Sequence, residues 1–478
     1  MNMTKSKLFT VLSWLLLSAP LFAASLPTPV SQALKAAGIP ESAIGIYVHE
    51  IGARKSLLAV NADTAMNPAS VMKLVTTFAG LELLGPAYSW KTELYADGVL
   101  KGDTLRGNLV IKGYGDPKLN LENFWLLTRK LRQTGLREIS GDLVLDGSAF
   151  NLSNGDPAAF DNKPYRAYNV APEALLVNYR TLSLRLIPQP ESKTVRVVAD
   201  PLPESLELSN KLTLTSGRCS EWRDALAAEI RTDKTGSASV TLNGSYAADC
   251  GEKTYLLSLQ DSSAYTYSLF RQLWAQHGGI IRGKARIGAA PEGMSPLETW
   301  QSPPLAEIIR DINKFSNNIA ARQLFISLGA GTITPPAPAT LAKSVSVIRQ
   351  WLASKQLDFP ELVLENGSGL SRTERISTRH LGELLLAAFH SPLMPEFVSS
   401  LPISAVDGTM KKRFNGSAVA GQAHIKTGLL EGVRTMAGYV LDQSGRRVVV
   451  VFFVNHPKSG SAQPAMDALL QWAYERPS

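Results

Sequence analysis

The pattern of hydrophobic and polar positions first predicts a mixed α/β segment in residues 25–88. Alternating residues at 43–51 and 56–60 are typical of two β-strands. Apolar residues then recur at helical spacing, starting at Asn67 and Pro68, which suit the N-cap and the first turn of a helix. We therefore predict a helix, two strands and a second helix in this segment.

Residues 89–297 have a different pattern, in which short alternating segments are separated by turns rich in Gly, Asn, Asp and Pro. Two helical patterns, at 120–133 and 264–277, interrupt these segments. The pattern predicts a mostly β insertion made of two modules, with the inner one at about 113–170.

Residues 298–478 return to a mixed α/β pattern. A long helix is predicted at 304–328, and a strand hairpin at 433–441 and 447–455. Further helices are predicted at 342–355, 378–389 and 462–474. The chain is thus expected to belong to the α/β (α+β) class.

The first 24 residues are predicted to be a signal peptide. Lys5 and Lys7 precede an apolar run at 8–17, and small residues follow as far as Ala24. No later apolar stretch is long enough for a membrane helix, since 448–454 has only the length of a strand. We therefore expect an exported, periplasmic protein without a transmembrane anchor, for which a loose membrane or wall association stays open.

Composition and charge narrow the class of partners. Hydrophobic residues make up 45% of the chain and charged residues 19%, which is typical of a globular protein with a large core. The net charge of +8 favours an anionic polymer surface such as a cell wall, although a charge spread over so many residues also fits no special partner. Nucleic acid is not expected, because dense Lys/Arg runs with interleaved aromatic residues are absent from the sequence.

Cys219 and Cys250 are the two cysteines of the chain. In an exported protein an even count predicts a disulfide. On the loop-entropy model, this bond would stabilise the fold by roughly 3 kcal/mol.

The first motif with chemical meaning is Ser70-Val71-Met72-Lys73. Residues three apart share a helix face, so the Lys73 amine can reach the Ser70 hydroxyl. A serine becomes a good nucleophile when a neighbouring base takes its proton, and a lysine serves as that base when burial or another cation lowers its pKa. An exposed Ser and Lys on a helix would give the same string, so this motif is weak alone.

A second motif, at 316–318, reads Ser-Asn-Asn and lies within the helix predicted at 304–328. Ser316 offers a hydroxyl that can relay a proton, and Asn318 an amide that can hold a substrate carbonyl. The alternative is that these polar residues simply face water.

Lys-Thr-Gly occurs twice in the chain, at 234–236 and at 426–428. The polar flanks of the first copy predict a hairpin turn. The second copy leads into the strand predicted at 433–441, where Gly428 would let a substrate backbone lie close to the sheet edge. We therefore take Lys426, Thr427 and Gly428 as the candidate site residues.

Ser-x-x-Lys, Ser-x-Asn and Lys-Thr-Gly in this order resemble the signature of penicillin-binding proteins and serine β-lactamases. The segment 366–372, which reads Asn-Gly-Ser-Gly-Leu-Ser-Arg, and the Asp-Gly-Thr at 407–409 add to the likeness. The chain is similar to the class C penicillin-binding proteins of the type of penicillin-binding protein 4, the D-alanyl-D-alanine carboxypeptidases/endopeptidases of peptidase family S13.

The resemblance implies a penicillin-binding fold with a five-stranded antiparallel sheet flanked by helices. Residues 25–88 and 298–478 would form this catalytic domain, and 89–297 would hold the inserted, mostly β domains. The substrates implied are peptidoglycan peptides, and the inhibitors are β-lactams. No cofactor or metal is implied, and the six His show no metal-ligand spacing. The oligomeric state stays open.

The resemblance also implies roles for individual residues. Ser70 would attack the D-Ala carbonyl with Lys73 as base, and the Ser70 and Leu429 N–H groups would bind the oxyanion. Ser316 and Lys426 would pass a proton to the leaving amine. Asn318 would hold the acyl side chain.

Many relatives carry Thr or Ser where this chain has Leu429, so we expect recognition of the terminal carboxylate to be altered. Thr427 and Arg434 are candidates to compensate. In the insertion, Asp161 and Tyr165 are candidates to contact an amino-bearing side chain of the substrate, although an ordinary surface turn fits them equally.

Ser368 and Met410 are further candidates to line the pocket. Two rival functions stay open. A β-lactamase would need a deacylating base, for which we find no clear Glu-x-x-Leu-Asn in the main domain. A non-catalytic wall-binding scaffold would be expected to lose one of the motifs, whereas all three are intact here.

Overall fold

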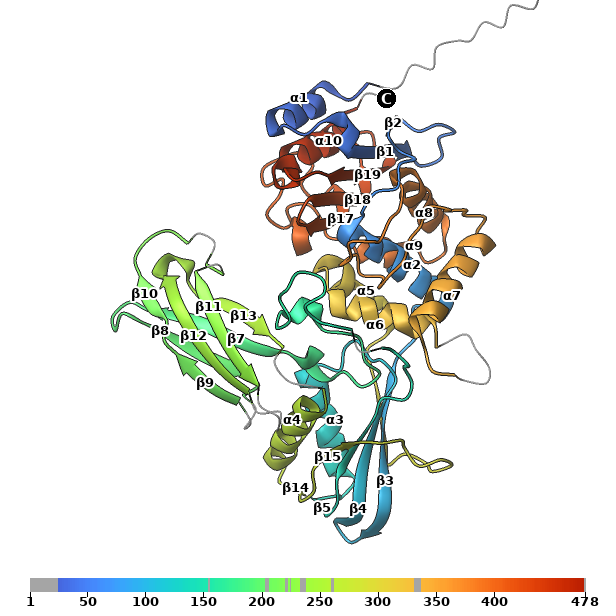
Figure 1. Ribbon diagram of the computed structural model, residues 1–478. Helices are drawn as coiled ribbons and strands as arrows, with labels where there is room; N and C mark the ends of the chain where they lie inside the picture. The colour runs from blue at the N-terminus through green and yellow to red at the C-terminus, as the bar shows by residue number, and fades with distance from the viewer. Residues whose placement is uncertain are drawn as a thin grey trace, which may run out of the picture.

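The computed structural model (Figure 1) describes most of the chain after its first 24 residues. The predicted signal peptide and the first Lys-Thr-Gly copy lie outside the described residues. The ranges described are 25–153, 155–202, 206–219, 222–223, 225–232, 238–258, 262–330 and 337–476.

A five-stranded antiparallel sheet, in the order β17-β18-β19-β1-β2, joins the two ends of the chain. It confirms the five-stranded antiparallel sheet expected from the sequence. The central strands are buried on both faces, which explains their continuous apolar runs rather than alternation. The strands are β1 (Ile44–Glu50), β2 (Leu58–Val60), β17 (Ala423–Leu430), β18 (Val433–Leu441) and β19 (Arg447–Asn455).

Helices cover both faces of this sheet (Figure 1). α1 (Thr28–Ala37) and α10 (Gln463–Glu475) pack on one face around a core that includes Met436 and Phe452. The other face carries a larger helical layer around Phe78 and Phe325. Its helices are α2 (Lys73–Leu84), α5 (Leu305–Lys314), α6 (Asn318–Leu328), α7 (Leu341–Ser354), α8 (Thr378–His390) and α9 (Met394–Ser399).

The single helix expected at 304–328 is wrong, because α5 and α6 are separate helices. Ser316, between them, has a φ of +58°, a left-handed conformation that stops a helix. Asn317 then starts α6 as its N-cap, accepting a hydrogen bond from the backbone N–H of Ala320. The Ser-x-Asn motif therefore lies at a break between helices.

The insertion forms two further sheets of seven strands each, which Figure 1 shows as separate lobes. We call one lobe outer, because its strands come from both ends of the insertion, and the other inner, because its strands lie between them in the sequence. In the outer lobe, α3 (Leu121–Gln133) and α4 (Ser262–Gln276) pack on the sheet around Phe124 and Phe270. Its strands are β3 (Lys91–Lys101), β4 (Thr104–Gly113), β5 (Glu138–Ile139), β6 (Leu143–Asp146), β14 (Ile280–Ile281), β15 (Ala285–Ile287) and β16 (Glu298–Gln301).

The inner lobe has a core of its own around Trp222, Val240 and Tyr246. The predicted disulfide is confirmed: Cys219 and Cys250 are bonded, with their Cα atoms 4.6 Å apart. The strands are β7 (Leu182–Gln189), β8 (Thr194–Asp200), β9 (Leu206–Asn210), β10 (Thr213–Thr215), β11 (Leu226–Thr232), β12 (Ala238–Ala247) and β13 (Lys253–Leu257).

The inner sheet therefore lies at 182–257, later in the chain than the 113–170 expected from the sequence. The strands β5 and β6, which fall in that expected range, pair in parallel with β4 and belong to the outer sheet. Parallel pairing of strands distant in sequence is invisible to local alternation, which explains the difference.

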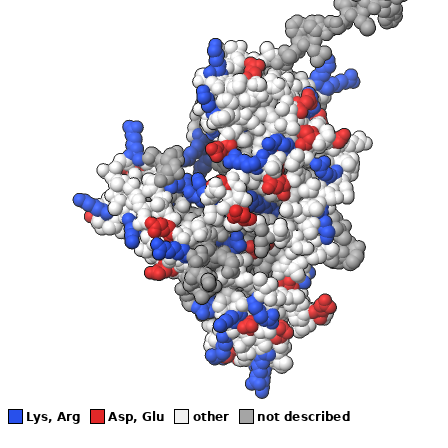
Figure 2. Space-filling model, in the orientation of Figure 1, with Lys and Arg blue, Asp and Glu red and all other residues white. Residues whose placement is uncertain are grey.

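The surface charges do not form a single patch on the face shown in Figure 2, where basic and acidic side chains are interspersed. Among the described residues, none of the helices is both long and apolar enough to cross a bilayer.

Candidate active site

The candidate nucleophile lies on a strained turn before α2. Ser70 is part of the 3-10 turn η2 (Ala69–Met72), and Ala69 has a φ of +46°. Asn67 holds the turn by accepting a hydrogen bond from the Ala69 N–H at 2.9 Å and donating another to the Ser371 carbonyl. The Thr435 hydroxyl of β18 donates to the Pro68 carbonyl. The turn is thus fixed to both the sheet and the helical layer.

Lys73, the first residue of α2, points back at Ser70. Its Nζ atom lies 3.1 Å from Ser70 Oγ and 2.5 Å from Asn318 Oδ1, and it also donates to the Ser368 carbonyl. Burial, reinforced by the nearby Lys426 cation, holds the pKa of the Lys73 amine well below its ordinary value. A buried amine bonded to neutral acceptors is suited to act as a base.

Ser316 and Lys426 form a second pair. The Lys426 amine donates to Ser316 Oγ at 2.8 Å and to the Thr427 carbonyl at 2.8 Å. Its side chain is fully buried, and burial lowers the pKa of Lys426 to about 7. The pair can therefore give or take a proton near neutral pH. The structure thus brings together Ser70, Lys73, Ser316, Asn318 and Lys426.

The free edge of β17 passes directly beside the candidate nucleophile. A Cβ atom added to Gly428 would lie 2.9 Å from the backbone nitrogen of Ser70 and would collide with the Thr435 hydroxyl. Only glycine fits there. Gly369, in the loop at 366–372, approaches the turn η2 equally closely, since a Cβ atom added to it would lie 2.8 Å from the Ser70 backbone nitrogen.

Leu429 presents its backbone N–H at this edge. The Ile425 N–H points away from β18 and donates to the Pro402 carbonyl, and in an antiparallel pair such outward groups recur at every second residue. The Leu429 side chain is 63% exposed. Next to it, the Thr427 hydroxyl donates to the hydroxyl of Thr409 at 2.8 Å.

Sequence reasoning missed a buried carboxylate behind the site, that of Glu374. Its Oε1 accepts three backbone hydrogen bonds, from the N–H groups of Glu365, Asn366 and Gly367 at 2.9 to 3.1 Å. This loop also carries the Ser368 carbonyl that accepts from Lys73. Burial raises the pKa of Glu374, and its charge acts on Lys73. Periodicity gives no signal for such a residue, because an acid in a polar loop looks exposed.

Asp161 lies on a segment at the edge of the cluster. Its neighbour Phe160 packs against Ala69 and Leu370, next to Ser70. Although partial burial opposes ionisation, hydrogen bonds from Tyr168 and Asn169 lower the pKa of Asp161. The carboxylate is thus held in place by these two hydrogen bonds.

Four of the residues expected at the site have other roles in the fold, namely Ser368, Tyr165, Met410 and Arg434. The Ser368 hydroxyl donates to Asn366, so only its backbone carbonyl faces Lys73. Tyr165 packs against the core of the inner sheet, and Met410 is fully buried under the main sheet.

Arg434 does not join the cluster either. It lies opposite Leu429 on β18, on the face covered by α10, and its guanidinium donates to the Gly460 carbonyl and to Gln463 Oε1. The expectation that Arg434 replaces the missing hydroxyl is therefore corrected. Thr409, on the short turn η6 (Gly408–Met410), is the polar side chain that the structure places beside Thr427.

In the part of the chain that the structure describes, His, Cys, Asp and Glu nowhere gather in groups of three or more that could hold a metal ion. The chemistry of the site is that of hydroxyl and amine groups.

Several known proteins are similar to this chain along most of its length. The D-alanyl-D-alanine carboxypeptidase of Actinomadura sp. (strain R39) is 28% identical over 88% of this chain and 79% of its own length. The D-alanyl-D-alanine carboxypeptidase DacB of Haemophilus influenzae is 23% identical over 89% of this chain and 88% of that protein.

Solved structures share the fold. The crystal structure of penicillin binding protein 4 from Haemophilus influenzae superposes with a TM-score of 0.77 at 22% identity, covering 93% of this chain and 99% of that one. A predatory peptidoglycan endopeptidase of Bdellovibrio bacteriovorus gives a TM-score of 0.51 at 15% identity, covering 90% of this chain and 92% of the other. Residues 26–475 match the D-Ala-D-Ala carboxypeptidase 3 (S13) family, and the chain belongs to that family.

Proposed function

We propose that this protein is a serine-type D-alanyl-D-alanine carboxypeptidase that cuts the peptide stems of peptidoglycan through an acyl-enzyme on Ser70. The observation that carries the proposal is the contact between Ser70 Oγ and the buried Lys73 amine at 3.1 Å. Membership of the S13 family supports the reaction class. The Dictyostelium discoideum relative, a penicillin-sensitive carboxypeptidase 23% identical over 83% of this chain, supports sensitivity to β-lactams.

In the first step, Ser70 Oγ attacks the carbonyl carbon of the penultimate D-Ala, and Lys73 Nζ takes the hydroxyl proton. A C–O bond forms and the carbonyl oxygen becomes an oxyanion. The N–H groups of Ser70 and Leu429 stabilise this charge. Burial lowers the pKa of the Lys73 amine well below its ordinary value, which favours the neutral form that accepts the proton.

In the second step, the C–N bond breaks and the terminal D-Ala leaves. Its nitrogen takes the proton of the Ser316 hydroxyl, which Lys426 replaces across their 2.8 Å hydrogen bond. The acyl group remains as an ester on Ser70. Lys73 is now protonated and Lys426 is neutral.

Hydrolysis restores both lysines. A water molecule attacks the ester carbon, and its proton returns to Lys426 through Ser316. The ester C–O bond breaks, and Ser70 Oγ takes back the proton held by Lys73. The shortened peptide leaves with a new carboxylate.

The remaining polar groups would bind the substrate. Because Asn318 Oδ1 is occupied by Lys73, its amide NH₂ group is left to hold the carbonyl of the acyl side chain. The hydroxyls of Thr427 and Thr409 would contact the terminal carboxylate. Asp161 would bind an amino-bearing side chain of the stem.

We further propose that 25–88 and 298–478 form the catalytic domain, that 89–297 form the insertion, and that residues 1–24 direct the protein to the periplasm. The two ends of the chain share one sheet, which supports this division.

Labelling with a fluorescent penicillin tests the nucleophile. The wild type should form a stable adduct, and Ser70→Ala should form none. If the wild type stays unlabelled while an established penicillin-binding protein is labelled in parallel, the protein would instead be a non-catalytic wall-binding scaffold. An adduct hydrolysed within seconds would identify a β-lactamase instead.

Purified muropeptides test the reaction. Uncross-linked pentapeptide stems should lose one D-Ala, and cross-linked dimers report endopeptidase action in the same assay. If Ser70→Ala released D-Ala as fast as the wild type, the proposed mechanism would be wrong.

A further inference from the structure

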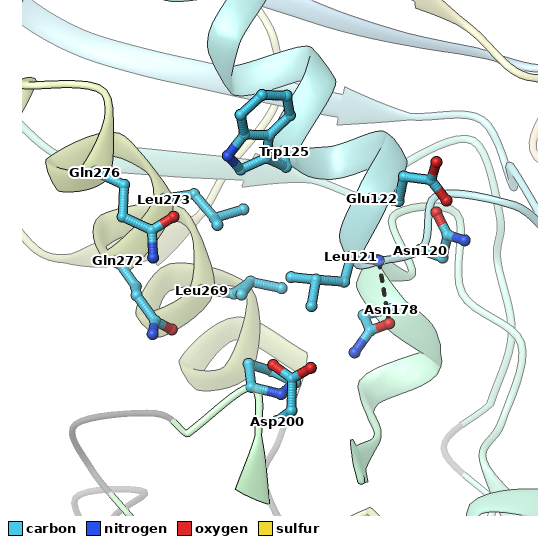
Figure 3. Close-up of a pocket in the computed structure, with 11 residues that line it drawn as sticks. Asn120, Leu121, Glu122, Trp125, Asn178, Asp200, Leu269, Gln272, Leu273 and Gln276 are labelled. Atoms are coloured by element: carbon cyan, nitrogen blue, oxygen red, sulfur yellow. Dashed lines mark hydrogen bonds between the residues drawn. The ribbon is translucent and has the colours of Figure 1, made fainter.

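A cavity separate from the candidate active site lies entirely within the insertion, between α3, α4 and the end of β8 (Figure 3). Its volume is about 550 Å³, which is in the range of small-molecule sites. Its lining residues all fall within 120–276, and none of them belongs to the catalytic cluster. Nothing in the proposed mechanism uses this cavity.

The floor of the cavity is apolar and one end carries an aromatic ring. Leu121 and Leu269 meet across the floor, and Trp125 lies at the end opposite Asp200 (Figure 3). The Trp125 side chain is 37% exposed, although the neighbouring Phe124 is fully buried against α4. Contacts with Arg129 and His277 fix the ring's orientation. An exposed aromatic ring of this size contributes little to the stability of the fold, but its fixed face can stack against a ligand.

Two of the amides around the cavity already have structural partners. Asn178 accepts from the Leu121 N–H and donates to Tyr265, and Asn120 caps α3. Gln272 also lines the cavity, but its Oε1 atom has no accessible surface, so it offers a ligand no acceptor. The acceptors that a ligand can reach are the oxygens of the exposed side chains of Glu122, Asp200 and Gln276.

The charged side chains that line the cavity itself are both acidic. The carboxylates of Glu122 and Asp200 stand at its rim with the amide of Gln276, and neither Lys nor Arg is among the described lining residues. An anionic ligand is therefore disfavoured. A purely apolar ligand would cover the oxygens of Glu122, Asp200 and Gln276 without supplying donors to them. The Arg129 guanidinium, which already lies over the Trp125 ring, disfavours a cation at that end. The lining therefore calls for a neutral ligand with an apolar face and several hydroxyl or amide donors.

We propose that this cavity binds a neutral oligosaccharide, with a sugar ring stacked on Trp125 and hydroxyl or acetamido groups donating to Gln276, Glu122 and Asp200. A pyranose has C–H groups on its faces and donors around its edge, which matches an aromatic platform beside planar amide and carboxylate acceptors. The choice of an amino-sugar strand rests on the proposed function, because the peptide stems of peptidoglycan are attached to such strands. The cavity would hold the glycan while the catalytic domain works on a stem.

Calorimetric titration of the full protein with a β-1,4-linked tetramer of N-acetylglucosamine tests the proposal. The wild type should bind saturably. Trp125→Ala and Gln276→Leu should each weaken binding by about tenfold or more. Gln133→Leu, an exposed residue on α3 outside the cavity, is the matched control and should bind like the wild type.

Fluorescent-penicillin labelling of the same variants separates this proposal from the proposed function. All three should be labelled like the wild type, which also shows that they are folded. Labelled protein that does not bind the tetramer at about 10 mM, or binds it unchanged in Trp125→Ala, would overturn the cavity proposal alone. A D-Ala-D-Ala pentapeptide that binds in competition with the tetramer, and is lost in Trp125→Ala, would overturn it as well.

Discussion

Two lysines, Lys73 and Lys426, are fully buried without a carboxylate among their hydrogen-bond partners. Such burial destabilises the charged form of each amine, and the protein bears this cost because the proposed reaction needs amines that exchange a proton readily: Lys73 accepts one and Lys426 donates one. At the residue scale, therefore, function and stability are opposed at these positions.

Lys426→Met should remove acylation and stabilise the protein, on the order of 3 kcal/mol at pH 7. The pKa of Lys426 is lowered in the folded state to about 7, so between about pH 7 and the ordinary pKa of lysine the unfolded chain binds more protons than the folded one. The unfolding free energy of the wild type should therefore rise with pH across this window. The stability that Lys426→Met adds should shrink over the same window. Thermal unfolding at pH 7 and pH 9 measures this, and an equal gain at both would contradict the assignment.

Glu374 acts as a positioning residue through the loop it holds. Glu374→Gln keeps an acceptor for the three backbone N–H groups but removes a charge that raises the pKa of Lys73. The variant should remain folded, and the acidic limb of its acylation rate should move to lower pH. Glu374→Ala leaves these donors unpaired and should label at least about tenfold more slowly. If the pH profile of acylation is unchanged in Glu374→Gln, the charge of Glu374 does not influence the pKa of Lys73.

Leu429→Thr tests the departure from related enzymes. A hydroxyl at the free edge of β17, near Thr427 and Thr409, should raise kcat/KM on a D-Ala-D-Ala peptide by about three- to tenfold, roughly one added hydrogen bond to a charged group. Leu429→Val is the control without a hydroxyl. If Leu429→Thr leaves kcat/KM unchanged, recognition of the carboxylate does not depend on this position.

Short motifs predicted which residues would meet, because Ser70, Lys73, Ser316 and Lys426 carry distinctive chemistry at fixed spacing. They could not predict that the Arg434 guanidinium bonds to Gly460 and Gln463, since these partners lie on a segment distant in sequence. Glu374 was missed for a related reason: its partners are backbone N–H groups, which have no sequence signature.

At the scale of elements, the site depends on close approach between the edge of β17 and the turn η2. Helical periodicity correctly predicted α2, α7, α8 and α10 within a few residues, because each presents an apolar face to a core. It failed at the break between α5 and α6, since the apolar pattern continues through it while Ser316 adopts a left-handed conformation that only the tertiary fold imposes.

Gly428→Ala should slow penicillin labelling by about a hundredfold, since about 2.7 kcal/mol of misplacement at the reacting group gives that factor. Its added methyl group would lie 2.9 Å from the Ser70 nitrogen and push β17 away from η2. Gly460→Ala is the matched control, because an added Cβ there meets nothing within 4 Å. Labelling rates measured on folded protein decide, and equal rates for both variants would refute the close approach.

At the scale of the whole molecule, the catalytic domain and the two inserted sheets have separate hydrophobic cores. Hydrophobic alternation predicted that an insertion exists and is mostly β, but it placed the inner module too early. The strands at 138–146 have the composition of a local sheet, and only their parallel pairing with β4 assigns them to the outer lobe.

Replacing Cys219 and Cys250 by Ser should destabilise the inner sheet by roughly 3 kcal/mol while leaving the penicillin-labelling rate unchanged. Limited proteolysis should then cut first within 182–257. Loss of labelling in parallel with proteolysis would show that the lobes unfold as one unit.

The arrangement of the main sheet has a consequence for biogenesis. β1 lies between β2 and β19, so the first strand to leave the ribosome must wait for the last one before it gains its second neighbour. Lys426 likewise arrives only with the final tenth or so of the polypeptide. A chain truncated before β19 therefore cannot assemble the reactive centre, which forms only once synthesis has passed residue 455.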